Sequence, residues 1–148
     1  MGAMSIHGLA ILLGRLLLAG TFLLAGLPKI QDPATFAASI EAYRIVSGPA
    51  ALWAALLLPW LEVIIGIGLL TPWLERASST IIILLLALFI GLHSSAWMRG
   101  LDISCGCFGE SGTGLDYHWS ILRNLALLAV TAFILRSSLR NKTHPHHS

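Results

Sequence analysis

The two cysteines of the chain, Cys105 and Cys107, are separated by a single residue, Gly106. A thiol pair at this spacing can exchange electrons as a reversible disulfide, bind a soft metal ion, or stay unpaired. A purely structural disulfide is disfavoured, because the loop that it would close is too short to constrain the unfolded chain much. Gly106 leaves room for a small disulfide ring. We therefore interpret the cysteines as the redox pair of a thiol–disulfide oxidoreductase.

A soft-metal site is the main alternative for the same pair. Two thiolates suit Cu(I) or Hg(II), and His93 or His118 would help to complete a Zn(II) site. Neither a second cysteine pair nor a methionine cluster accompanies the motif. The redox interpretation is therefore favoured, with a soft-metal carrier or permease as the alternative.

Four apolar segments surround the cysteine motif and must position it. The chain of 148 residues is 56% apolar and 11% charged, whereas soluble domains carry about 25% charged residues. A bilayer needs about 20 apolar residues per crossing helix. The sequence therefore predicts an all-α, integral membrane four-helix bundle in one domain, with spans at residues 6–27, 49–70, 77–98 and 119–135. The net charge of +2, without a long basic run, argues against nucleic acid as a partner.

A shorter helix is predicted between the first two spans. Phe36, Ile40 and Tyr43 recur at helical spacing within residues 34–45. This pattern is typical of a helix that lies in the membrane interface rather than crossing it. Residues 136–148 read as a polar, basic tail. Whether copies of the chain form a homo-oligomer is left open.

The loops predict the orientation in the membrane. An even number of spans leaves both termini on one side, where four Lys and Arg residues lie against three on the other. The positive-inside rule then favours cytoplasmic termini. The Cys105/Cys107 loop would face the periplasm of a bacterial inner membrane, where disulfides persist.

Two charged residues lie well inside the first two predicted spans. Arg15 and Glu62 are at similar distances from the cytoplasmic ends of their segments. Charges at this depth need a partner or a cavity. We therefore expect an ion pair between Arg15 and Glu62 that sets the register of the two helices.

A second group of polar residues is expected near the outer ends of the spans: Lys29, His93, His118 and Arg123. Cations under the cysteine loop would favour thiolate over thiol, although an arginine here could equally reach the headgroups. One cysteine pair is also only half of an electron relay. We expect a thioredoxin-like partner on one side and a quinone or another protein on the other, with a quinone site near His93 and Arg123.

Residues spread along the whole chain resemble a known family. The opening is similar to the DoxX-type membrane proteins, and the later motifs resemble the MauE branch of that group. The first set is Arg15, Gly20, Phe22, Gly26, Lys29 and Asp32-Pro33; the second is Tyr43, Pro59-Trp60-Leu61-Glu62, Gly66, Gly100-Leu101, Cys105-Gly106-Cys107-Phe108-Gly109 and Arg123-Asn124.

The resemblance implies a four-helix membrane bundle that works beside a periplasmic thioredoxin-like protein. Its role would be to make or handle disulfides during maturation of methylamine dehydrogenase or other exported proteins. The wider group includes a subunit implicated in thiosulfate oxidation with quinone as acceptor. On this resemblance Cys105 and Cys107 are the redox pair, and Arg15, Glu62 and Arg123 are the conspicuous intramembrane polar positions. A membrane partner that stabilises an oxidoreductase without catalysis is a further alternative.

Overall fold

The computed structural model describes residues 5–101 and 117–140, and all the regular structure in these ranges is helical. The elements are α1 (Ile6–Gln31), α2 (Pro33–Ala42), α3 (Pro49–Leu70), α4 (Glu75–Met98) and α5 (Tyr117–Arg140). The four longer helices are long and apolar enough to cross a membrane. The predicted all-α fold with four spans and a short intervening helix is therefore confirmed.

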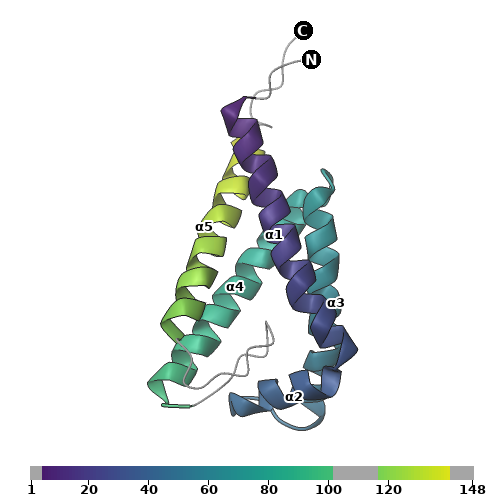
Figure 1. Cartoon of the computed structure of the whole chain (residues 1–148), viewed down its shortest axis with the longest axis vertical. Helices are drawn as coiled ribbons and strands as arrows, with labels where there is room; N and C mark the ends of the chain where they lie inside the picture. The colour runs from purple at the N-terminus through teal and green to yellow at the C-terminus, as the bar shows by residue number, and fades with distance from the viewer. Residues whose placement is uncertain (1–4, 102–116, 141–148) are drawn as a thin grey trace.

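The long helices form a splayed bundle (Figure 1). α1 packs mainly against α3, and α4 packs mainly against α5. The start of α1 and the end of α5 lie at one end of the bundle, and α2 lies across the other end (Figure 1). The junctions between α4 and residue 102, and between residue 116 and α5, lie at this second end. The cysteines themselves fall outside the described residues.

Local signals in the sequence set the ends of α1 and α2. The Ser5 hydroxyl caps α1 by accepting a hydrogen bond from the Gly8 amide at 3.2 Å. α1 then continues through Pro28 to Gln31, four residues beyond the predicted end of the span. Asp32 separates the two helices and caps α2, because its carboxylate accepts a bond of 3.1 Å from the Thr35 amide. Lys29 therefore belongs to the last turn of α1 rather than to a loop.

Two glycines bring α1 and α3 into close contact. A Cβ added at Gly26 would lie 2.9 Å from the carbonyl oxygen of Pro59, and one added at Gly66 would lie 3.3 Å from that of Ala19. Small residues at such positions let membrane helices approach closely. The two contacts also define the antiparallel register, with Gly26 level with residues 59–63 and Gly66 level with residues 19–23.

A small core lies between the long helices, and their outward faces are apolar as well. The core contains Leu18, Phe22, Ile65, Leu69, Ile82, Leu85, Leu86, Leu127 and Ile134. Many leucines, isoleucines and tryptophans are exposed, including Trp73, which is 95% exposed in the turn after α3. Without a surrounding bilayer such a surface would be unfavourable. The chain is a multi-pass membrane protein whose outer surface contacts lipid.

Candidate functional site

A buried ion pair lies at the end of the bundle where α2 is found. The Lys29 Nζ atom is 2.9 Å from Oε1 and 3.0 Å from Oε2 of Glu62. The side chains are 3% and 1% exposed, respectively. α1 supplies the lysine from its last turn, and α3 supplies the glutamate just after Pro59. The pair satisfies both charges at a depth where neither could remain alone.

Arg15 does not pair with Glu62, so that expectation is wrong. Arg15 instead forms its ion pair with Glu75, the first residue of α4. The reason is the register of α1 against α3. Gly66 is level with residues 19–23, so α3 ends at about the level of residue 17, close to Arg15. At 1.5 Å per residue, α1 projects about 16 Å beyond that end. Arg15 and Glu62 are similar numbers of residues from the ends of their helices, but they therefore lie at different levels in the bundle.

The Arg15–Glu75 pair belongs to a second polar cluster, far from the first. The buried Ser79 lies one turn after Glu75 on α4. Arg15 Nε, Glu75 Oε1 and Ser79 Oγ have no hydrogen-bond partner among the described residues. Sequence reasoning missed Glu75, because it falls at a loop–helix junction where an acidic residue is unremarkable in its own right.

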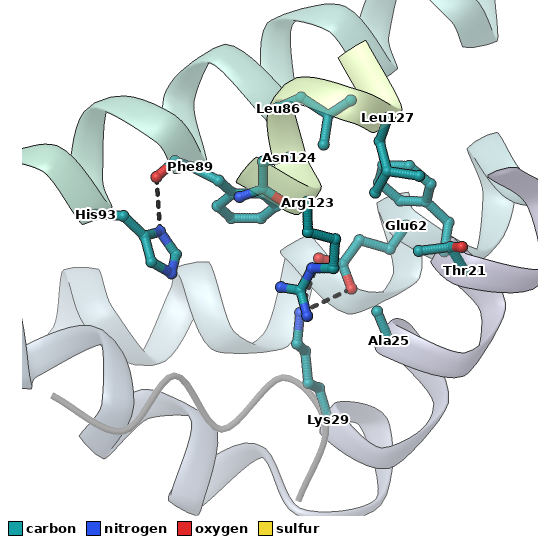
Figure 2. Close-up of a pocket in the computed structure, with 11 residues that line it drawn as sticks. Thr21, Ala25, Lys29, Glu62, Leu86, Phe89, His93, Arg123, Asn124 and Leu127 are labelled. Atoms are coloured by element: carbon teal, nitrogen blue, oxygen red, sulfur yellow. Dashed lines mark hydrogen bonds and ion pairs between the residues drawn. The ribbon is translucent and has the colours of Figure 1, made fainter. Parts of the chain in front are cut away.

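α5 completes the site around Lys29 and Glu62. Arg123 and the buried Asn124 line a cavity of about 40 Å³ together with Lys29, Glu62 and His93. Figure 2 shows the Arg123 side chain pointing toward the Lys29–Glu62 pair. Two cationic side chains thus converge on the Glu62 carboxylate. Asn124 was quoted only as part of a motif, and its burial could not be foreseen.

His93 has one fixed ring nitrogen and one without a partner. Its Nδ1 lies 2.7 Å from the carbonyl oxygen of Phe89, one turn earlier on α4. A carbonyl only accepts hydrogen bonds, so Nδ1 carries the proton. Nε2 has no hydrogen-bond partner within the described part of the chain, although the residue is only 4% exposed. The imidazole also makes an edge contact with the Tyr43 ring, with centroids 6.0 Å apart.

The structure brings four of the six predicted supporting residues together and separates the other two. Lys29, Glu62, His93 and Arg123 line the cavity of about 40 Å³. Arg15 lies toward the opposite end of the bundle with Glu75. His118 is exposed near the start of α5, where its ring meets Trp97 edge-on at 5.0 Å. Neither residue lines the cavity.

Cys105 and Cys107 lie outside the described residues, but the flanking elements can be located. α4 ends at Met98 and α5 begins at Tyr117. The Arg99 guanidinium donates a 2.9 Å hydrogen bond to the Tyr43 carbonyl, which ties the end of α4 to the end of α2. The segment that carries the cysteines is therefore joined to the bundle at the end that contains Lys29.

Comparison with known proteins identifies the family. The sequence matches the family model for methylamine utilisation protein MauE over residues 8–137, which run from α1 to α5. The chain belongs to the MauE family. The matched range contains Cys105 and Cys107 as well as the residues that line the cavity. The resemblance to the wider DoxX group stays a prediction.

Two curated MauE relatives are similar to the chain over most of its length. The methylamine utilization protein MauE of Paracoccus denitrificans is 30% identical over 122 residues, which is 81% of this chain and 65% of that protein. The protein of the same name from Methylorubrum extorquens is 31% identical over 110 residues, 74% of this chain and 59% of that protein. The chain thus spans somewhat less than two thirds of these relatives. No solved structure matches it significantly.

Proposed function

We propose that this protein is a membrane thiol–disulfide redox protein with Cys105 and Cys107 as its reactive pair. The supporting observation is that the cysteine segment joins the bundle at the end where Lys29, His93 and Arg123 converge. Positive charge near a thiol lowers its pKa, and the thiolate is the nucleophile in disulfide exchange. Lys29 and Arg123 are cationic side chains at the end of the bundle that the cysteine segment joins, which supports a role in such chemistry.

The reaction is exchange with a thioredoxin-like partner outside the cytoplasm. A thiolate of the pair attacks the partner's disulfide and forms a mixed disulfide, and one partner thiolate leaves. The second thiolate of the pair then attacks its neighbour's sulfur, which releases the partner as a dithiol. Two electrons pass to the partner, and the Cys105/Cys107 pair becomes a disulfide. The same steps in reverse oxidise the partner and leave the pair reduced, ready to pass electrons onward.

The cellular role that we propose follows from the relatives' names and from the predicted topology. The protein would lie in a bacterial inner membrane with cytoplasmic termini and a periplasmic cysteine segment. It would handle disulfides during maturation of exported proteins, including those of methylamine utilisation. The relatives' names support this pathway, and the weak excess of Lys and Arg on the terminal side supports the orientation.

The test is electron exchange with a periplasmic thioredoxin-like protein in detergent or nanodiscs. We expect Cys105→Ser and Cys107→Ser each to abolish turnover, and one of them to trap a mixed disulfide with the partner. Ser104→Ala, next to the motif, is the matched control and should retain turnover. Normal turnover by the double Cys→Ser variant would exclude the proposed reaction.

The soft-metal alternative is tested in the same samples. The described residues contain no group of three or more His, Cys, Asp or Glu side chains that could hold a metal ion. A metal site would therefore need the cysteines, with His93 as a further ligand. Stoichiometric copper, mercury or zinc on purified protein with reduced thiols would favour that alternative. Turnover with a partner and no bound metal would favour the redox function.

A further inference from the structure

A second, larger cavity lies on the other side of Lys29 and His93. It has a volume of about 290 Å³ and is lined by α2, α3, α4 and the segment after α2. This volume is at the small end of the range of about 300–1,000 Å³ for ligand pockets, which suits one small ring system. Its wall is almost wholly apolar and includes Phe36 and Ile40 of α2, Leu58 of α3 and Phe89 of α4.

The polar side chains that line this cavity include Ser39, Tyr43 and His93, and His93 carries a buried nitrogen without a partner among the described residues. The hydrogen bond from Nδ1 to the Phe89 carbonyl holds the ring in one orientation. Figure 2 shows the ring projecting away from the α4 backbone, with its second nitrogen on the far side from that bond. A buried polar atom without a partner costs about 1–3 kcal/mol. A ligand that supplies a hydrogen bond to Nε2 would recover this cost.

The charged residue at the inner end of the cavity is already neutralised. Lys29 is bound to Glu62 through both carboxylate oxygens. Its ammonium also lies 4.8 Å from the centre of the Phe36 ring and 5.9 Å from that of Phe89. An anionic headgroup such as a lipid phosphate would have to compete with Glu62 for this lysine. The cavity therefore favours a neutral ligand.

The chemistry of the wall narrows the ligand class further. A plain acyl chain would fill the apolar space but leave His93 Nε2 without a partner. A flat ring that bears hydroxyl groups would donate a hydrogen bond to Nε2 and lie against the aromatic side chains of Phe36 and Phe89. Within a membrane, hydroquinones combine a ring of this kind with an apolar tail.

We propose that the cavity between α2, α3 and α4 binds the head group of a membrane hydroquinone, with one of its hydroxyl groups donating a hydrogen bond to His93 Nε2. This inference rests on the proposed function for the source of the electrons. The Cys105/Cys107 dithiol becomes a disulfide and loses two electrons and two protons. A quinone gains both and becomes the hydroquinone that the cavity holds.

The test measures binding separately from electron transfer. Decylubiquinol is titrated into the full-length protein with reduced cysteines in nanodiscs, and affinity is measured by isothermal titration calorimetry. His93→Phe keeps a ring but removes the hydrogen bond, and we expect it to bind about tenfold more weakly. Ala54→Phe places a ring in the cavity wall and should prevent binding. Ala87→Phe, on an exposed position of α4 that lines neither cavity, is the matched control and should bind normally.

The cysteine variant distinguishes failure of the site from failure of the redox function. Cys105→Ser/Cys107→Ser should bind decylubiquinol as the unmodified protein does but should not reduce decylubiquinone. Undiminished binding by both His93→Phe and Ala54→Phe would overturn the site, even if thiol exchange with a partner is normal. A phospholipid that co-purifies in the cavity and is not displaced by decylubiquinol would also overturn it. Normal binding together with absent thiol exchange would support the site and contradict the proposed function.

Discussion

The Lys29 ammonium lies within 3.0 Å of both carboxylate oxygens of Glu62, and both side chains are almost completely buried. This contact joins the last turn of α1 to the middle of α3 and forms the polar floor of the candidate site. Because each charge is compensated by the other, removing one charge is expected to destabilise the protein more than removing both.

The first prediction concerns this asymmetry. Glu62→Gln should destabilise the bundle by about 3–5 kcal/mol, because it leaves the Lys29 ammonium buried without a counter-charge. The double variant Lys29→Met/Glu62→Leu should recover most of that loss, since neither charge then needs to be desolvated. Thermal unfolding in detergent measures both. A double variant as unstable as Glu62→Gln would show that the pair does not act as a unit.

The second prediction concerns the contact between α1 and α3. Gly26→Ala should destabilise the protein by about 1–3 kcal/mol, because the new Cβ would lie 2.9 Å from the Pro59 carbonyl oxygen and force the helices apart. Gly20→Ala is the matched control on the same helix, where a Cβ meets nothing within 4 Å. It should be neutral or slightly stabilising. Equal melting temperatures for the two variants would contradict the close approach at Gly26.

The third prediction tests the partner of Arg15. A double-mutant cycle with Arg15→Gln and Glu75→Gln should give a coupling energy of about 0.5–3 kcal/mol in thermal unfolding. The same cycle between Arg15→Gln and Glu62→Gln should be additive within about 0.5 kcal/mol, since the two residues share no contact. Coupling in the second cycle and none in the first would restore the pairing expected from sequence.

The fourth prediction concerns pH and the helix that covers the larger cavity. Hydrogen bonds from the Thr35 hydroxyl and then from the Thr35 amide hold the pKa of Asp32 below its usual value of 3.8. A folded-state pKa below the unfolded one means that the stabilisation is present above pH 3.8 and is lost as the pH falls through the lower, folded value. The protection of the α2 amides against hydrogen exchange, measured relative to the intrinsic exchange rate at each pH, should therefore fall in that acidic range.

The control for this pH effect is chemical. Asp32→Asn cannot titrate, so exchange of the α2 amides should lose this acid-dependent step. Thr35→Val removes the hydroxyl donor and should shift the step to higher pH, toward 3.8. If the α2 amides of the unmodified protein are equally protected above and below this range, Asp32 does not control the start of α2.

Structural features that depend on a short stretch of chain could be predicted from the sequence. Hydropathy and length alone identified four spans, because a helix in lipid satisfies its own backbone groups and needs no other element to be recognised. The spacing of Phe36 and Ile40 likewise predicted α2. The helix ends were less accurate: α1 passes through Pro28, and α5 continues to Arg140, where basic residues are suited to a helix C-terminus.

The cysteine motif and the polar positions could be singled out from the sequence by itself. Cys105 and Cys107 are predicted as the reactive pair, and Lys29, Glu62, His93 and Arg123 are polar residues in or beside apolar spans. Only the tertiary structure decided which of these charges meet. That choice depends on the register of α1 against α3, which the close contacts at Gly26 and Gly66 define and which no count along one helix reveals. The cavity beside His93 likewise exists only where three separate helices meet, because its walls are far apart along the chain.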